Sequence, residues 1–257
     1  MFFDTHAHYD DEKFDVDRDE VILRANSMGV ENILNVGINL ETSKKSIELA
    51  KKYDFIYAAV GVHPHEIENL EQDYINQLED LINQNRHKVV AIGEIGLDYY
   101  YDFAPKSLQQ KVFIEQIELA KKVGLPVAIH DRDAHGDTLD IIKQQHVSEV
   151  SGILHCFSGS QEMANEVLKQ GLYIAIGGVV TFKNAKKIVD IIKNVPMDRL
   201  LIETDLPYLT PEPFRGKRNE SAYLKYVVEK IAKIKDLPEQ EVANITTNNA
   251  KRLFKIG

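Results

Sequence analysis

Short apolar runs alternate with longer amphipathic segments along the whole chain. The runs are rich in β-branched and other apolar residues and are bounded by polar positions, which is typical of buried strands. We distinguish eight of them: Phe2–Asp4, Asn32–Val36, Ile56–Val60, Val89–Ile92, Pro126–Ile129, Gly152–Leu154, Tyr173–Ile176 and Leu200–Ile202.

The longer segments between the runs carry helical spacing of apolar residues and signals for helix ends. Segment 16–29 has acidic residues in its first turn and stops at a glycine, and segment 107–124 also ends at a glycine. Segment 41–53 places its apolar residues near one stripe. Residues 221–253 predict two further helices, the last of which opens close to Pro238.

Strands that alternate with helices over 257 residues predict a (β/α)8 barrel, an α/β fold of the TIM type, with extra C-terminal helices. An open doubly wound sheet is the alternative, and it usually has a glycine-rich phosphate loop after its first strand. That position here holds THAHYDD, which contains no glycine. No linker or low-complexity tract interrupts the chain, so we expect residues 1–257 to form a single domain.

Metal-binding and catalytic residue types follow nearly every predicted strand. The carboxyl ends of the strands in such a barrel converge on one mouth, where active sites lie. Six of the nine histidines fall at or just past these ends. The residues concerned are His6, His8, His63, His65, Glu94, His130, His155, Glu203 and Asp205.

The spacing of His6 and His8 fits a strand. Side chains two residues apart on a strand share a face, so both rings can point into the barrel mouth. A single histidine at a strand end more often makes a structural hydrogen bond than it binds a metal. His87, His135 and His146 lie in helical or loop contexts, and we assign them a structural role as well. Asp4 either orients a histidine or only caps the strand.

The ligand types narrow the kind of metal site. Cys156 is the only cysteine, which excludes a cysteine-rich zinc site. Imidazole and carboxylate ligands suit zinc, manganese, magnesium, cobalt or nickel, and the sequence does not choose among them. The candidate ligands are more numerous than one tetrahedral ion with an open position can take, so we expect two divalent ions about 3.5–4 Å apart. These ligands are His6, His8, His130, His155, Glu94 and Asp205.

Six motifs together resemble the TatD family of metal-dependent deoxyribonucleases, within the amidohydrolase superfamily. The resemblance runs from Phe2 to Leu253, and the motifs keep the order and spacing of that family. They are DTHAHYD, GVHPH, AIGEIGLDYY, VAIHDRDA, LHCFSGS and LIETDLPYLTPEPFRGKRNE.

The resemblance implies a specific assignment of ligands. One ion is bound by His6, His8 and Asp205, and the other by His130 and His155. Glu94 bridges the two ions, where some amidohydrolases use a carboxylated lysine. Asp205 and Glu94 are the implied catalytic residues, with Asp205 as ligand and general base at once. The chain departs from its relatives at Ser221, where they usually have proline, and we expect Ser221 to cap a helix.

Substrate contacts are expected from the loops at the same mouth. Arginine pairs bidentately with phosphate. Lys217 and Arg218 either contact phosphate in the same way as the other cations or are ordinary solvent-exposed charges of the loop. Glu203, two residues before Asp205, can share its face and orient a histidine ligand, or it is only a buried, hydrogen-bonded carboxylate. The aromatic residues Tyr99–Tyr101 and Phe103 either stack on a base or pack the rim. The candidate substrate-binding residues are His63, His65, Arg132, Glu203, Arg215 and Lys217.

The net charge of −9 argues against a protein that coats long stretches of nucleic acid, and leaves trimming of ends or small-molecule chemistry open. Our main hypothesis is a deoxyribonuclease that cleaves single-stranded DNA from its 3′ end. The alternatives are a metal-dependent amide or ester hydrolase, or a deacylase acting on a small or nucleotide-linked substrate, and a non-catalytic scaffold.

The chain also carries expectations about its compartment. Its lone cysteine suits a reducing cytoplasm, no apolar run approaches the ~20 residues that cross a bilayer, and no signal peptide is evident. We therefore expect a cytoplasmic protein without membrane contact. The sequence is compatible with a monomer.

Overall fold

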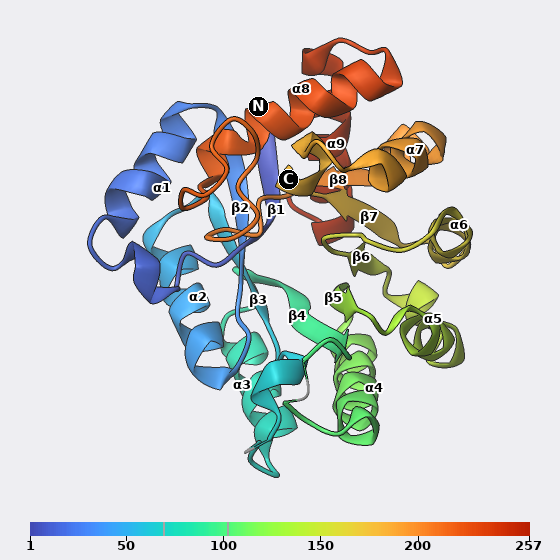
Figure 1. The fold of residues 1–257 in the computed structure, drawn as a ribbon. Coiled ribbons are helices and arrows are strands. Elements are labelled where there is room, and N and C mark those ends of the chain that lie inside the picture. The colour runs from blue at the N-terminus through green and yellow to red at the C-terminus, as the bar shows by residue number, and fades with distance from the viewer. Residues whose placement is uncertain (69, 102) are drawn as a thin grey trace.

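The computed structural model describes residues 1–68, 70–101 and 103–257. Every predicted strand is present, and all eight form one parallel sheet in sequential order. Figure 1 shows these strands at the centre of the molecule with helices around them. The strands are β1 (Phe2–Ala7), β2 (Val30–Val36), β3 (Ile56–Val60), β4 (Val89–Asp98), β5 (Val127–Arg132), β6 (Gly152–Leu154), β7 (Tyr173–Ile176) and β8 (Leu200–Ile202).

Helices follow the strands as the amphipathic pattern predicts. The two predicted C-terminal helices are α8 and α9, and no helix within the described ranges is long and apolar enough to cross a membrane. The α-helices are α1 (Arg18–Ser27), α2 (Leu40–Lys52), α3 (Tyr74–Gln84), α4 (Lys106–Val123), α5 (His135–Gln144), α6 (Gln161–Lys169), α7 (Lys186–Asn194), α8 (Leu224–Lys235) and α9 (Glu239–Phe254).

Hydrogen bonds join the first strand to the last and close the barrel. The amide of Asp205 donates to the carbonyl of His6 at 2.9 Å, and the amide of His8 donates to the carbonyl of Leu206 at 3.1 Å. The hydroxyl of Thr5 donates to the carbonyl of Ile202 at 2.9 Å. The predicted (β/α)8 barrel is confirmed.

Four strands are longer than their apolar runs predict. β1 continues to Ala7, β4 to Asp98 and β5 to Arg132, and β2 begins at Val30. The extra residues of β4 are paired along β5, with Leu97 opposite Asp131 and Asp98 opposite Arg132. Backbone pairing with a neighbouring strand therefore holds polar and glycine positions in the sheet, although their side chains give no strand signal.

Apolar side chains fill the barrel and the layer between strands and helices. Inside the barrel, Phe3 lies with Leu34, Ala91 and Leu201 in one buried cluster. The C-terminal part of α9 belongs to the same cluster, and the ring of Phe254 lies 5.6 Å from that of Phe3. The amino end of the barrel is therefore closed by α9, which leaves the carboxyl end for the site.

Candidate metal centre

The predicted ligand side chains meet at the carboxyl end of the barrel. Ala7 and Tyr9 belong to the outer apolar layer, whereas the rings of His6 and His8 between them approach Glu94 inside the mouth. The other side chains arrive from β4, β5 and the segments that follow β6 and β8. The six residues brought together are His6, His8, Glu94, His130, His155 and Asp205.

The carboxylate of Glu94 divides this cluster into two groups. Its Oε2 lies 3.3 Å from Nε2 of His6 and 3.6 Å from Nε2 of His8. Its Oε1 lies 2.9 Å from Nδ1 of His130 and 2.8 Å from Nε2 of His155. Each oxygen of one carboxylate therefore faces a different histidine pair, as a bridging ligand would.

Asp205 joins the first of these groups. Its Oδ1 lies 3.6 Å from Nε2 of His8, and its side chain is 17% exposed, so it borders both the cluster and the open mouth. The backbone at Asp205 has a φ of 55°, an uncommon conformation for a residue other than glycine. The hydrogen bond from the backbone amide of Asp205 to the carbonyl of His6, where the barrel closes, holds that conformation.

The spacing of the donor atoms fits divalent cations. An ion with ligands at about 2.0–2.2 Å in a tetrahedron separates those ligands by roughly 3.3–3.6 Å. The nitrogens of His6 and His8 are 3.1 Å apart, and those of His130 and His155 are 3.3 Å apart. The cluster therefore has the composition and spacing of a metal site.

Hydrogen bonds outside the cluster decide which ring nitrogen faces inward. Nδ1 of His8 donates to the carbonyl of Val36 at 2.8 Å, which leaves the lone pair of Nε2 for the cluster. Nε2 of His130 donates to Oδ2 of Asp98 at 3.1 Å, which leaves the lone pair of Nδ1. Both rings are thereby held in the tautomer that a metal ligand needs.

Asp98 contacts two of these histidines and was not among the residues predicted from the sequence. It is fully buried at the end of β4, and it also accepts a hydrogen bond from Nε2 of His65 at 2.8 Å. Burial alone would raise the pKa of Asp98, but the hydrogen bonds from His130 and His65 hold that pKa far below its usual value. Asp98 therefore stays ionised. Its place four residues after Glu94, on the same strand, was the available signal.

His63 and His65 lie beside the cluster in a different role. The lone pair of Nδ1 in His63 accepts the amide proton of His65 at 3.1 Å, so in the neutral ring Nε2 carries the proton. That Nε2 is 3.6 Å from Oε1 of Glu94. His63 therefore presents a donor to the mouth, which suits a substrate contact better than a metal ligand.

Burial and neighbouring charges shift the histidine pKa values in opposite directions. Burial lowers the pKa of His8, but the hydrogen bond to Asp205 and nearby carboxylate charges outweigh burial and raise it to about 10. Burial also opposes protonation of His130, yet Asp98 and Glu94 raise its pKa to about 9. For His6, burial and the adjacent His155 prevail and lower the pKa to about 4. Without cations, His8 and His130 therefore hold protons at neutral pH.

Glu203 lies behind the cluster. It is fully buried, its Oε1 accepts the amide proton of Cys156 at 2.6 Å, and the same oxygen is 3.9 Å from Nδ1 of His155. Burial raises the pKa of Glu203 to about 8. This place favours the role of a buried carboxylate beneath His155 over direct contact with substrate.

Asp4 and Ser221 hold the end of β1 against the segment after β8. Asp4 accepts from the hydroxyls of Thr204 and Ser221, each at 2.6 Å, and its hydrogen bond with His6 comes from the backbone amide at 3.4 Å. The expectation that Ser221 caps a helix is wrong. Its hydroxyl donates to Asp4 and accepts from Tyr9 at 3.0 Å, while Glu220 occupies the position before the helical turn.

The candidate phosphate-binding residues separate into free and paired charges. Arg132, Arg215 and Lys217 are exposed, and the guanidinium of Arg132 lies 3.9 Å from the ring centre of Tyr100. Arg218 instead forms a two-bond ion pair with Asp17, at 2.8 and 2.6 Å. The charge of Arg218 is already neutralised by this contact.

The aromatic residues after Glu94 form a partly exposed platform. The rings of Tyr101 and Phe103 stack with centres 5.3 Å apart, and both lie edge-on to His65. Their exposed fractions are 39% and 52%, high for aromatic side chains. Tyr99 differs, because its hydroxyl donates to Asp137 at 2.6 Å and its ring packs against the core.

The remaining histidines lie outside the cluster, as expected. His87 and His146 are exposed, and His135 opens α5 with a 2.6 Å contact between its Nδ1 and Oδ2 of Asp131.

The family model and the sequence relatives that match this chain agree with one another. The family model described as TatD related DNase matches residues 3–255. A Bacillus subtilis protein named uncharacterized metal-dependent hydrolase YabD is 51% identical, with all of both chains covered. A Cronobacter sakazakii protein named 3′-5′ ssDNA/RNA exonuclease TatD is 35% identical, over 98% of this chain and 97% of its own.

A solved structure agrees with the sequence relatives. The crystal structure of YJJV, a TatD homolog from Escherichia coli K12, superimposes with a TM-score of 0.94 at 33% identity, over 100% of this chain and 98% of the other. The predicted family resemblance is confirmed over nearly the whole length, and this chain belongs to the family of TatD-related DNases.

Proposed function

We propose that this chain is a divalent-metal-dependent hydrolase that cleaves phosphodiester bonds in single-stranded nucleic acid, starting at the 3′ end. The observation that carries the proposal is the carboxylate of Glu94, whose two oxygens face two separate histidine pairs. Relatives named as metal-dependent hydrolases, and one named as a 3′-5′ exonuclease on single-stranded DNA and RNA, support the same reading.

Two cations fit the donor set. His6, His8 and Asp205 would hold one, His130 and His155 would hold the other, and Glu94 would be shared. When bound, such ions lower the pKa of water toward ~7 and offset charge that develops on phosphoryl oxygens.

Asp205 is placed to move the proton of the attacking water. The hydrogen bond from His8 and the neighbouring histidine charges outweigh burial and lower the pKa of Asp205, so it is ionised at neutral pH. Its partial exposure lets a water molecule reach the carboxylate from the mouth. Asp205 therefore accepts that proton and returns it to the leaving oxygen.

The groups around the mouth suit a phosphate on an aromatic-bearing strand. His63 presents an N–H toward the mouth, where it can donate to a phosphoryl oxygen. The exposed cations Arg132 and Arg215 suit phosphate oxygens, and the stacked rings of Tyr101 and Phe103 suit a base. This combination favours a nucleic-acid phosphodiester over an uncharged amide.

The activity is tested with single-stranded DNA and RNA oligonucleotides labelled at the 5′ end, with manganese, magnesium, cobalt or zinc supplied in turn. We expect a ladder of products that shorten by one nucleotide from the 3′ end. Glu94→Gln keeps the shape of the side chain but removes its charge, so we expect it to abolish cleavage and reduce bound metal. Metal-loaded protein that cuts no oligonucleotide would reject the proposal in favour of ester or amide hydrolysis, measured on an aminoacylated nucleotide.

The phosphate contact is tested with two arginine variants. Arg215→Ala removes an exposed guanidinium at the mouth, and we expect kcat/KM for an oligonucleotide to fall ~10-fold or more while bound metal is unchanged. Arg218→Ala is the matched control, because the charge of Arg218 is paired with Asp17. Equal losses in both variants would remove the specific role of Arg215.

A further inference from the structure

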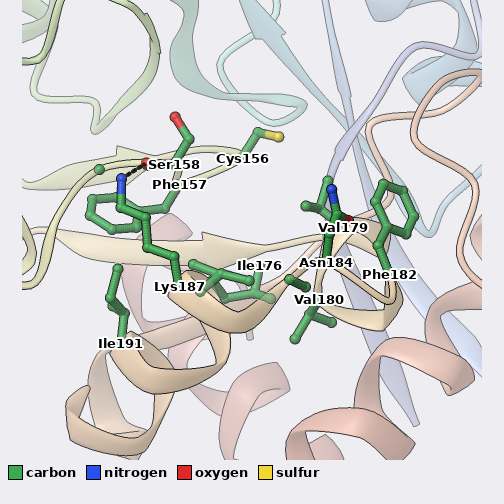
Figure 2. Close-up of a pocket in the computed structure, with 14 residues that line it drawn as sticks. Cys156, Phe157, Ser158, Ile176, Val179, Val180, Phe182, Asn184, Lys187 and Ile191 are labelled. Atoms are coloured by element: carbon green, nitrogen blue, oxygen red, sulfur yellow. Dashed lines mark hydrogen bonds between the residues drawn. The ribbon is translucent and has the colours of Figure 1, made fainter.

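A pocket of about 260 Å³ lies beside the metal centre and is not used by the proposed chemistry. It lies between the loop that follows β6 and the short helical turn Gly178–Thr181 that follows β7, with α7 beneath it. Figure 2 shows Cys156 and Phe157 on one side and Val179 and Phe182 on the other, with Ile176 between them.

The pocket lies next to the segment that carries His155. Cys156 lines it and follows the ligand candidate His155, and the amide of Cys156 donates to Glu203 at 2.6 Å. Gly177 lines the same side, and a methyl group on Gly177 would lie 3.5 Å from the side chain of Glu203. The pocket is therefore separated from the candidate ligand His155 by a single residue, Cys156.

The lining is apolar in depth and polar at its rim. Ile176, Val180 and Ile188 are buried, and Phe182 adds one partly exposed aromatic face. Ser158, Asn184 and Lys187 are exposed at the opening. A flat, uncharged ring with polar edges matches such a lining.

Two cations flank the pocket. The guanidinium of Arg215 lies 3.7 Å from the ring centre of Phe182. Nζ of Lys187 donates to the carbonyl of Ser158 at 2.9 Å, as Figure 2 shows. Both side chains are exposed, so each can reach an anion outside the pocket. An apolar slot between cations suits a group attached to phosphates, such as a base in a nucleic-acid strand.

We propose that this pocket binds the base of the nucleotide next to the phosphodiester that is cleaved. The inference rests on the proposed function, and it adds a place where the strand is held. The volume is below the ~300–1,000 Å³ of pockets for drug-sized ligands, so it takes one ring system and not a whole nucleotide. The sugar and phosphate then lie outside, between Arg215 and the metal centre.

The pocket is tested by binding, independently of cleavage. Thymidine 5′-monophosphate and deoxyribose 5-phosphate, which lacks the base, are titrated into the protein by calorimetry, with and without zinc. Stacking of a base is worth ~1–3 kcal/mol, so we expect the nucleotide to bind roughly 5- to 150-fold more tightly. Equal affinities in both conditions would overturn the proposal.

Val179→Trp fills the opening of the pocket, and Val16→Trp is the matched control because Val16 is 98% exposed elsewhere. We expect the preference for the nucleotide to fall to about one in Val179→Trp and to persist in Val16→Trp. Phe182→Leu, which removes the aromatic face but keeps an apolar side chain, serves if Val179→Trp does not fold. A preference that survives in folded Val179→Trp, or in Phe182→Leu, places the base elsewhere.

Cleavage separates this inference from the proposed function. An oligonucleotide that lacks the base next to the terminal phosphodiester should be cut roughly 5-fold or more slowly than the intact one. If both are cut at equal rates, the hydrolase proposal stands and the pocket proposal fails. If neither is cut but the nucleotide still binds through its base, the pocket stands and the cleavage proposal fails.

Discussion

Asp98 controls the position of His130, because it is the acceptor for the ring nitrogen that points away from the cluster. Asp98→Asn keeps the size of the side chain but replaces a charged acceptor with a neutral amide, which does not fix the tautomer of His130. Loss of such a partner typically costs 10- to 100-fold in metal affinity. We expect a loss of this size, measured by competition with a chromogenic chelator.

Asp137→Asn is the matched control for this variant, because Asp137 accepts from Tyr99 outside the cluster. Its metal affinity should equal that of the unmodified protein. Native affinity in Asp98→Asn would show that His130 is held by packing alone and would remove the positioning role of Asp98.

The protons held by the metal-free cluster give a second prediction for individual residues. The pKa values of His8 and His130 are raised to about 10 and about 9, so both rings are protonated at pH 7. A metal ligand must be deprotonated, so cation and proton compete. The pKa of His155 is raised as well, because the charges of Glu94 and Glu203 outweigh burial. We expect the release of at least two protons when the protein is fully loaded at pH 7, and an affinity that falls as the pH is lowered from 9 to 6.

This release is measured by calorimetry in two buffers of different ionisation enthalpy, because the difference in observed heat counts the protons. Uptake of metal without proton release would show that His8 and His130 are neutral in the metal-free protein. It would contradict the sign of both pKa shifts.

The contact between β4 and β5 sets the geometry of the cluster, since these strands carry Glu94 and His130. Gly96 has a φ of 142°, and a methyl group there would lie 2.0 Å from the carbonyl oxygen of His130. Gly96→Ala must push the strands apart or twist β4. We expect it to lower the urea midpoint of unfolding and to reduce bound metal.

Gly136→Ala is the matched control for that change. Gly136 lies in α5 with open space around its Cα, and alanine favours a helix by roughly 1 kcal/mol over glycine. Its metal content should be native and its stability equal or higher. Native metal content in a folded Gly96→Ala variant would show that the cluster tolerates a shift of β4.

The rhythm of apolar runs predicted the order of elements well. Four runs, beginning at Ile56, Gly152, Tyr173 and Leu200, match strands residue for residue. Burial on both faces makes such strands continuous in hydrophobicity, and that signal is local. The extension of β4 to Asp98 escaped prediction because it depends on pairing with β5, and pairing between strands is not visible in a local pattern.

The same distinction applies to the site. The meeting of six side chains was predicted because ligand-type residues stood at strand ends, where the fold brings them together: His6, His8, Glu94, His130, His155 and Asp205. The hydrogen bond between His130 and Asp98, and the hydrogen bonds of Ser221 with Asp4 and Tyr9, were not predicted. Each depends on a contact between side chains from different elements, and a serine before a helical turn looks the same whether it caps the turn or binds a buried carboxylate.

At the scale of the whole molecule, the chain carries 40 acidic and 31 basic residues, and the exposed cations Arg132, Arg215 and Lys217 lie at the end of β5 and in the segment after β8. Under the proposed function, we expect the net negative surface to repel the distant parts of a nucleic-acid strand and these three cations to attract the phosphates nearest the metal centre. This distribution favours a protein that holds a strand end briefly over one that coats a strand.

This distribution predicts a weak salt dependence of catalysis. Neutralising each phosphate of a single strand contributes about −0.7 to the slope of log affinity against log salt, so three cations give a slope of roughly −2. We expect kcat/KM for a long oligonucleotide to follow that slope in sodium chloride, and Arg215→Ala to make it shallower by about 0.7. A slope steeper than about −5 would require an extended basic track, and three cations at the mouth would then be too few to account for substrate binding.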